Sequence, residues 1–259
     1  MNVEFPKVRL HVDEPLAEGA SLTLAESQSH YVGRVMRMRE GDALALFNGT
    51  DGEWRGAIRT VARNAVSLRV ETMLRPQAPE PDLWLAFAPV KRLRIDYLVA
   101  KATELGASAL WPLFTRRTAV ERVKLERLAA NAVEAAEQCG RLTVPRVFEP
   151  ARLEDAIARW PAERHLLLLD ETGGPPAVDA LLRIRAERPA VRTAPWAVLC
   201  GPEGGFTRSE LDVIGNLSFV TRVGLGPRIL RAETAALAAL TCWQAVLGDW
   251  GESPPRSGS

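Results

Sequence analysis

Cysteine and histidine are scarce in this sequence of 259 residues, which contains three of each. The cysteines form no CxxC pair, and the histidines form no HxH or HxxxH pair. These six residues are Cys139, Cys200, Cys242, His11, His30 and His165. A disulfide framework and a bound metal ion are therefore not expected.

Long apolar runs and a large net charge are also lacking. Uninterrupted apolar runs such as Leu166–Leu169 are far too short to span a bilayer. The N-terminal segment MNVEFPKVRLHVDEP lacks the basic, apolar and small-residue order of a signal peptide, so a cytoplasmic protein is expected. The formal net charge is +1, so any nucleic-acid surface must be local.

A proline-rich segment, LRPQAPEPD, divides the sequence at residues 74–82. Its three prolines remove backbone donors and favour extended conformations, as in a semi-rigid linker. We predict a first domain over residues 1–75, a linker over 76–82, a second domain over 83–250 and a disordered tail over 251–259.

The first domain has the pattern of a small β-barrel. Strands are predicted at 43–47, 53–61 and 65–73, and Asn48-Gly49 and Asp51-Gly52 are strong hairpin signals. One helix is predicted near 29–38, with Ser27 or Ser29 as its N-cap.

The second domain alternates strands and helices. Short apolar runs predict strands at 83–90, 109–115, 165–170, 196–200 and 219–224. Helices are predicted at 93–105, 125–138 and 232–248, and Gly106 ends the first of them. A further helix is predicted from an N-cap at Thr207 or Ser209 to Leu217. This alternation is typical of an α/β fold with a parallel sheet covered on both faces.

Two glycine-rich loops follow the last two predicted strands, at 200–206 (CGPEGGF) and 224–234 (GLGPRILRAET). Neither is a phosphate-binding P-loop, which needs a lysine and a hydroxyl residue, and Ile229 stands where a dinucleotide fingerprint needs its third glycine. Tight structural turns are one interpretation. The strand end at 169–173 is a third candidate loop, and ligands bind at the carboxyl ends of strands in such sheets, so a binding site is favoured.

The motifs GPEGGFTRSELD and LGPRILRAETAAL, with HYVGRVMRMREGD, KATELG and AEQCGR, resemble the RsmE-like 16S ribosomal RNA uridine-N3 methyltransferases of the SPOUT superfamily. The resemblance covers most of the chain. It implies a PUA-like β-barrel followed by an α/β domain with a C-terminal trefoil knot. It also implies S-adenosylmethionine as cofactor, 16S ribosomal RNA in the small ribosomal subunit as substrate, and a homodimer.

Carried onto matching positions, the resemblance assigns the cofactor to three loops, in which Leu225, Ile229 and Leu230 can flank an adenine. The glycines leave room for backbone hydrogen bonds to its edge. The expected cofactor-binding residues are Leu169, Leu199, Gly201, Pro202, Glu203, Gly204, Leu225, Gly226, Pro227, Ile229 and Leu230.

Methylation of uridine N3 requires positioning, stabilisation of the uracil anion and a proton acceptor. Arg231 is the candidate for charge stabilisation; its alternative role is an ion pair with Glu233 or another carboxylate. Glu233 is expected to take the proton or orient Arg231, unless it only favours the helix dipole. Arg141, next to Gly140, is the third candidate, from the same subunit or from its partner, although a helix C-cap explains the glycine equally well.

An RNA-binding surface is predicted around Arg34, Arg37 and Arg39, which lie close to His30 and Tyr31. A solvated helix face is the alternative. Arg9 joins this surface through the resemblance alone, and Arg228 is a candidate phosphate contact or a solvated loop residue.

Two other functions remain open. A knotted ribose 2′-O-methyltransferase is disfavoured because residues 227–234 lack the Ser/Asn pattern of those enzymes. A non-catalytic RNA-binding or ribosome-assembly factor is disfavoured because both glycine-rich loops are intact, and cofactor binding would distinguish it.

Overall fold

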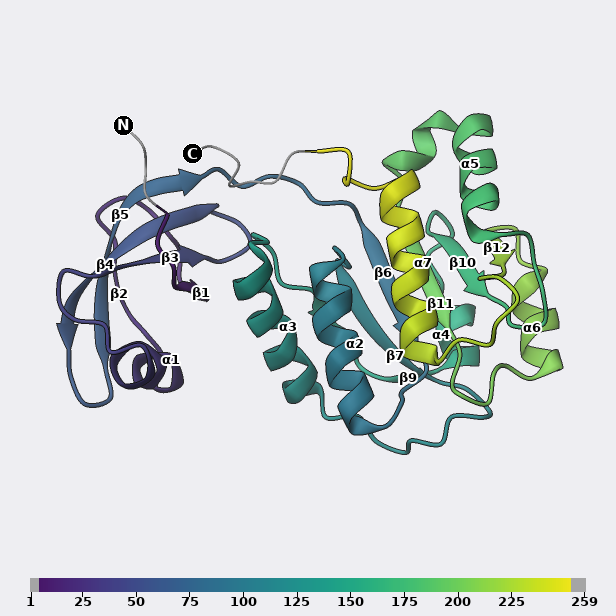
Figure 1. Ribbon diagram of the computed structural model, residues 1–259, viewed down its shortest axis with the longest axis horizontal. Coiled ribbons are helices and arrows are strands. Elements are labelled where there is room, and N and C mark those ends of the chain that lie inside the picture. Colours follow the sequence, from purple (N-terminus) through teal and green to yellow (C-terminus); the bar gives the residue numbers. More distant parts are fainter. Residues whose placement is uncertain (1–4, 253–259) are drawn as a thin grey trace. The chain divides into compact units, whose positions relative to one another are not determined.

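The computed structural model describes residues 5–252, except for the side chain of Arg92 (Figure 1). The chain forms two compact units. Among the described residues, the first comprises 5–79 together with Ala136–Val144, and the second comprises Glu80–Ala135 and 145–252. The predicted disordered tail lies outside the described residues from position 253 onward. Within residues 5–252, no helix has both the length and the apolar character of a membrane span.

The first unit is built on a mixed five-stranded sheet. Its strands are β1 (Arg9–His11), β2 (Ser21–Thr23), β3 (Ala43–Phe47), β4 (Glu53–Val61) and β5 (Val66–Arg75), in the order β1-β3-β4-β5-β2. β1 runs parallel to β3, and the other pairs are antiparallel. The three long predicted strands are confirmed to within two residues. β1 and β2 were not predicted, because three residues are too few to show a period.

One face of this sheet covers the core of the first unit. Leu44 and Leu46 of β3 alternate inward and pack with residues of the other strands, among them Ile58 and Leu68. This alternation explains the register of the β3–β4 hairpin, because a shift of one residue would expose the whole apolar set. The turn follows the predicted signals: the Asn48 side chain accepts from the N–H groups of Thr50 and Asp51.

The helix of the first unit begins earlier than predicted. α1 (Glu26–His30) continues directly into a π-helical turn, η1 (Tyr31–Val35). The expected serine cap is wrong: Ala25 is the N-cap residue and makes no side-chain capping bond. Ser29 is buried instead, where its hydroxyl donates to the Leu24 carbonyl and accepts from the Val66 N–H.

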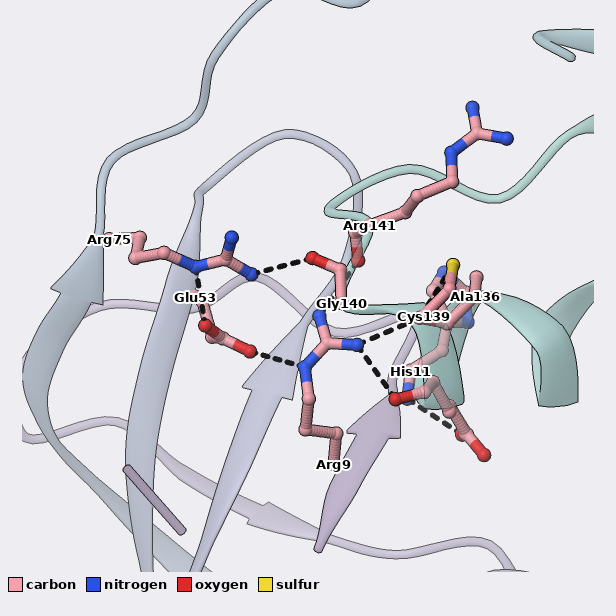
Figure 2. Close-up of polar contacts among 9 residues, drawn as sticks. Arg9, His11, Glu53, Arg75, Ala136, Cys139, Gly140 and Arg141 are labelled. Carbon is pink, nitrogen blue, oxygen red and sulfur yellow. Dashed lines mark hydrogen bonds and ion pairs between the residues drawn. The ribbon is translucent and has the colours of Figure 1, made fainter. Parts of the chain in front are cut away.

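A buried ion-pair network stabilises the first unit (Figure 2). Glu53 has 0% exposure and lies between two arginines. One of its oxygens accepts from Arg9 Nε, and the other accepts from Arg75 Nε at 2.7 Å. Burial raises the pKa of Glu53, but the hydrogen bonds from Arg75 and Arg9 outweigh it and hold the pKa below its ordinary value. Glu53 is therefore a buried carboxylate that both arginines keep ionised.

The same arginines bind the end of helix α3 (Leu125–Cys139), whose last residues belong to the first unit. Arg9 donates to the carbonyls of Ala136, Glu137 and Arg141 at 2.7–2.8 Å, and Arg75 donates to the Gly140 carbonyl at 2.8 Å. The last carbonyls of a helix have no partner within it and carry partial negative charge, so cations are favourable there. The network thus satisfies a helix terminus as well as a carboxylate.

The second unit contains a parallel sheet in the order β12-β10-β11-β6-β7-β8, with β9 paired to the end of β7. Its strands are β6 (Leu83–Phe87), β7 (Ala109–Phe114), β8 (Arg146–Val147), β9 (Ala151–Arg152), β10 (His165–Leu169), β11 (Trp196–Cys200) and β12 (Val220–Val223). Its other helical elements are α2 (Arg92–Glu104), α4 (Leu153–Ala158), α5 (Ala177–Glu187), the short turn η2 (Pro189–Arg192), α6 (Arg208–Gly215) and α7 (Ala232–Val246). The predicted α/β class with a parallel sheet is confirmed.

Helices cover both faces of this sheet. Leu166 and Leu168 of β10 face a core that contains residues of α4 and α6. On the opposite face α2 and α7 lie side by side (Figure 1), and Trp243 of α7 packs edge-on against Trp196 of β11. After β12, at the edge of the sheet, the chain returns to its centre as α7, which packs on β11. α4 and α5 were not predicted.

Replacing Glu53 by glutamine is expected to lower the free energy of unfolding by about 3–5 kcal/mol, because two buried guanidinium groups lose their counter-charge. Urea unfolding of the two proteins would measure this difference. Glu71→Gln is the matched control, since Glu71 pairs with Arg55 and Arg59 on the exposed face; its cost should not exceed about 1 kcal/mol. The wild-type advantage should be complete above an unfolded glutamate's pKa of about 4.3 and should shrink as the pH falls toward the lower folded pKa. Equal losses in the two variants would contradict this role.

Candidate active site

Three loops meet at the carboxyl edge of β10, β11 and β12 and enclose a cavity of about 320 Å³. This size is within the range of small-molecule sites, which lie at the carboxyl ends of strands in parallel sheets. The lining residues are Leu169, Asp170, Glu171, Gly173, Gly174, Pro176, Cys200, Gly201, Pro202, Glu203, Gly205, Phe206, Leu211, Val223, Gly224, Leu225, Gly226, Pro227, Arg228, Ile229, Leu230, Ala232 and Ala235.

Glycines permit two of these loops to touch through their backbones. Gly224 N–H donates to the Pro175 carbonyl at 3.0 Å, and the Gly224 carbonyl accepts from Ala177 N–H at 3.1 Å. A Cβ on Gly174 would lie 3.1 Å from Val223 Cα, tighter than most real Cβ contacts, so one backbone would have to move by a few tenths of an ångström. Glycine at this position thus favours the close approach of the loops after β10 and β12, which form one wall of the cavity.

The loop after β11 is held from both ends. Arg117 Nη1 donates to the Gly204 carbonyl at 2.9 Å. Thr207 caps α6 in a reciprocal pair with Glu210, and Glu210 also accepts from the Arg116 N–H at 2.9 Å. Burial raises the pKa of Glu210, but backbone N–H groups of Arg116 and Thr207 outweigh it and lower the pKa. The Thr207 cap predicted from sequence is confirmed.

The loop after β10 is fixed by Asp170, which is buried. Its carboxylate accepts from the N–H and hydroxyl of Thr172 at 2.9 and 2.7 Å and pairs with Arg222 of β12. Burial raises the pKa of Asp170, but the bonds from Thr172 and Arg222 lower it below its ordinary value. Asp170 is therefore ionised at neutral pH and is paired with Arg222 at the cavity wall.

Cys200 also lines the cavity, but its thiol is buried and protonated. It is buried at the end of β11 and lies 3.2 Å from the Ala232 carbonyl. Burial, together with the negative charges of Glu233 and Glu171, raises the pKa of Cys200 to about 12. Cys200 is therefore a protonated wall residue at neutral pH.

Most of the expected cofactor-binding residues line this cavity; Leu199 and Gly204 do not. Leu199 has 0% exposure, and its side chain faces the core beside α6. Gly204 faces Arg117, whose side chain supports the loop. The predicted loop at 169–173 lines the cavity through Asp170, Glu171 and Gly173, although sequence reasoning singled out only Leu169 in it as a cofactor-binding residue; Gly174 was missed.

Arg231 and Glu233 flank Ala232 at the start of α7. Arg231 is the N-cap residue and is exposed, and it makes no ion pair with any described residue. Glu233 is 8% exposed and pairs instead with Arg94 of α2, at 3.7 Å between Nε and Oε1. Arg94 also reaches Glu203, at 3.3 Å between Nη1 and Oε1. Sequence reasoning missed Arg94, which no motif had singled out.

Arg141 belongs to the first unit, where its carbonyl accepts from Arg9 and its Nη2 donates to Thr143 Oγ1 at 3.1 Å. Arg141 does not line the cavity described above, and its catalytic role stays a prediction. Figure 2 shows its side chain pointing away from the Glu53 network.

The predicted RNA-binding arginines differ in their surroundings. Arg34, Arg37 and Arg39 are exposed near η1, and Arg37 has a left-handed backbone with φ of 55°. The prediction for Arg9 is corrected: it is 5% exposed, and its guanidinium is bound to Glu53 and to carbonyl groups (Figure 2). Arg228 is exposed and lines the cavity. Within residues 5–252, no group of three or more His, Cys, Asp or Glu side chains could hold a metal ion.

Two family models match the chain. An RNA methyltransferase domain model matches residues 77–244, and an RNA methyltransferase PUA domain model matches residues 24–71. The ribosomal RNA small subunit methyltransferase E of Rickettsia conorii is 33% identical over 90% of this chain and 93% of that protein. Its namesake in Synechocystis is 34% identical over 88% of this chain and 74% of that protein.

Solved structures show the same fold. A putative methyltransferase from Legionella pneumophila, in complex with the bound cofactor SAM, is 29% identical with a TM-score of 0.81, over 95% of this chain and 100% of that one. A ribosomal RNA small subunit methyltransferase E from Neisseria gonorrhoeae, bound to S-adenosyl methionine, is 25% identical with a TM-score of 0.80 and the same coverage. Both of these similar proteins were solved with the same small molecule.

Alkylation should distinguish the thiols of Cys139 and Cys200. Cys139 is exposed, whereas Cys200 is buried and its raised pKa keeps the thiol protonated at pH 8. Iodoacetamide at pH 8, followed by peptide mass spectrometry, should label Cys139 much faster than Cys200. Unfolding in urea is the control and should make the two rates similar. Comparable rates in the folded protein would contradict the burial and protonation described for Cys200.

Proposed function

The chain belongs to the RNA methyltransferase family that includes the ribosomal RNA small subunit methyltransferase E proteins, and we propose that it methylates 16S ribosomal RNA with S-adenosylmethionine as methyl donor. The proposed target atom is N3 of a specific uridine. The observation that carries the proposal is the cavity itself: three loops predicted for the cofactor converge on it, in a fold shared with two structures that hold S-adenosylmethionine.

The residues of the cavity fit this cofactor. Leu225, Ile229 and Leu230 offer apolar contact to an adenine, and the adjacent glycines expose backbone groups to its edge. S-adenosylmethionine carries positive charge on its sulfonium and amino groups. The carboxylates of Glu171 and Glu203 line the same cavity and complement that charge.

When bound, the cofactor supplies an electrophilic methyl group. The protein must then hold the base in line and stabilise the negative charge that develops when N3 loses its proton. Arg231 is the proposed group for that charge, because it is exposed at the edge of the cofactor loop and makes no ion pair with a described residue. Glu233 and Arg141 remain the other proposed catalytic residues. The protonated thiol of Cys200 is unsuited to accept the proton.

The proposed RNA contacts lie in both units. Arg34, Arg37 and Arg39 are exposed beside Tyr31, which is 40% exposed, so phosphate contact and base stacking are available together. Arg228 is the proposed phosphate contact at the cavity. The proposed substrate is 16S ribosomal RNA within the small ribosomal subunit.

We further propose that the protein works in the cytoplasm as a homodimer. Leu93 and Tyr97 lie one turn apart on α2 and are 84% and 52% exposed, so they offer adjacent apolar surface to a second copy of the chain.

Incubation with methyl-labelled S-adenosylmethionine and unmodified small ribosomal subunits tests the function. Label is expected in 3-methyluridine after digestion to nucleosides. Label in a ribose 2′-O-methyl nucleoside would keep the fold and refute the proposed target atom. If neither transfer nor cofactor binding occurs with competent subunits, a non-catalytic RNA-binding factor is the better description.

Charge reversal at Arg34 and Arg37 should weaken RNA binding by about tenfold or more, because phosphate contacts supply much of the affinity. Affinity for S-adenosylmethionine should not change, since the cavity lies in the other unit. Filter binding and calorimetry would measure the two affinities. Charge reversal at Arg183 and Arg188, exposed in the second unit, makes the same change in net charge and is the control. If both double variants bind RNA equally weakly, Arg34 and Arg37 have no specific role in RNA recognition.

A further inference from the structure

Arg94 connects two acidic residues that come from different elements of the second unit. Its Nη1 lies 3.3 Å from an oxygen of Glu203, in the loop after β11, and its Nε lies 3.7 Å from an oxygen of Glu233, in the first turn of α7. Glu203 lines the cavity, whereas Glu233 lies behind it. A single guanidinium thus serves two carboxylates at the edge of the site.

Glu233 depends on this contact more than Glu203 does. The Glu233 side chain is 11% exposed, whereas the Glu203 side chain is 37% exposed and can be solvated. In the described part of the chain, Oε2 of Glu233 has no hydrogen-bond partner. A buried carboxylate that is only partly satisfied is costly and favours any cation within reach.

Another cation is close in the sequence. Arg231 lies two residues before Glu233, on the N-cap position of α7, and its guanidinium is exposed. If Glu233 paired with Arg231, the positive charge at the edge of the cofactor loop would be neutralised. The observed pairing of Glu233 with Arg94 leaves Arg231 uncompensated among residues 5–252.

We propose that Arg94 is a positioning residue that holds Glu233 away from Arg231, so that Arg231 keeps its charge for the base. This inference rests on the proposed function, in which Arg231 stabilises the developing uracil anion. The two acids then have different roles. Glu203 is a residue of the cofactor loop, whereas Glu233 would neutralise Arg231 if its contact with Arg94 were lost.

The availability of Arg231 can be measured without any activity assay. Phenylglyoxal modifies free guanidinium groups, and peptide mass spectrometry of the full-length protein gives the rate for Arg231. In Arg94→Gln we expect this rate to fall about fivefold, the effect that a partly exposed ion pair has on an equilibrium. In the double variant R94Q/E233Q the rate should recover, because glutamine offers no charge to Arg231.

R94Q/E203Q is the matched control, since it removes the other carboxylate that Arg94 holds. Its Arg231 should stay as protected as in R94Q. The double variant R94Q/E233Q also removes the unpaired buried charge, so it should fold at least as well as R94Q. Unchanged modification of Arg231 in R94Q, or equal recovery in both double variants, would overturn the inference.

The kcat for methyl transfer to small ribosomal subunits supplies the second measurement. R94Q should lower kcat, because Glu233 then competes for the charge of Arg231. An unchanged kcat in R94Q would overturn the inference. If wild-type protein transfers no methyl group while R94Q still protects Arg231, the charge arrangement stands and the proposed function fails.

Discussion

The close approach of two backbones, at Gly174 and Gly224, is the constraint on which the cavity depends. Neighbouring parallel strands end at one edge of a sheet, so the loops that follow them begin side by side. Here the hydrogen bonds of Gly224 to Pro175 and Ala177 join the loops after β10 and β12. A Cβ at position 174 would crowd Val223, so a residue without a side chain favours this wall. The loop after β11, held by Arg117 and the Thr207 cap, completes the enclosure.

The charged side chains around the cavity of the second unit fall into two groups, those that form ion pairs and those that do not. Asp170 is paired with Arg222, and Glu203 and Glu233 share Arg94. These pairs lie against the cavity or behind it, where unpaired charge would be costly. No ion pair within the described residues involves the guanidinium of Arg231, which stands at the start of α7. A site with this arrangement presents positive charge to a polyanionic substrate although the whole chain has a net charge of only +1.

In the first unit, arginine residues also serve a structural purpose. Arg9 and Arg75 surround one buried carboxylate and bind the carbonyls that end α3 (Figure 2). Residues 136–144 thereby become part of the first unit, although they follow the proline-rich linker in the sequence. The Glu53 network is a fold-determining element, whereas the exposed arginines near η1 remain available to a ligand. Burial, not residue type, separates the two groups.

The sequence by itself determined the α/β class, most strand positions and the three loops of the cavity, because apolar periodicity, proline breaks and glycine motifs act over a few neighbouring residues. It did not predict α4, α5 or the short strands β1 and β2, whose patterns are weak or brief. The structural role of Arg9, the burial of Leu199 and the contacts of Arg94 with Glu203 and Glu233 were decided only by the tertiary structure. The strength of an ion pair depends on which distant segments fold together and on how well they exclude water. Residue spacing along the chain gives information on neither.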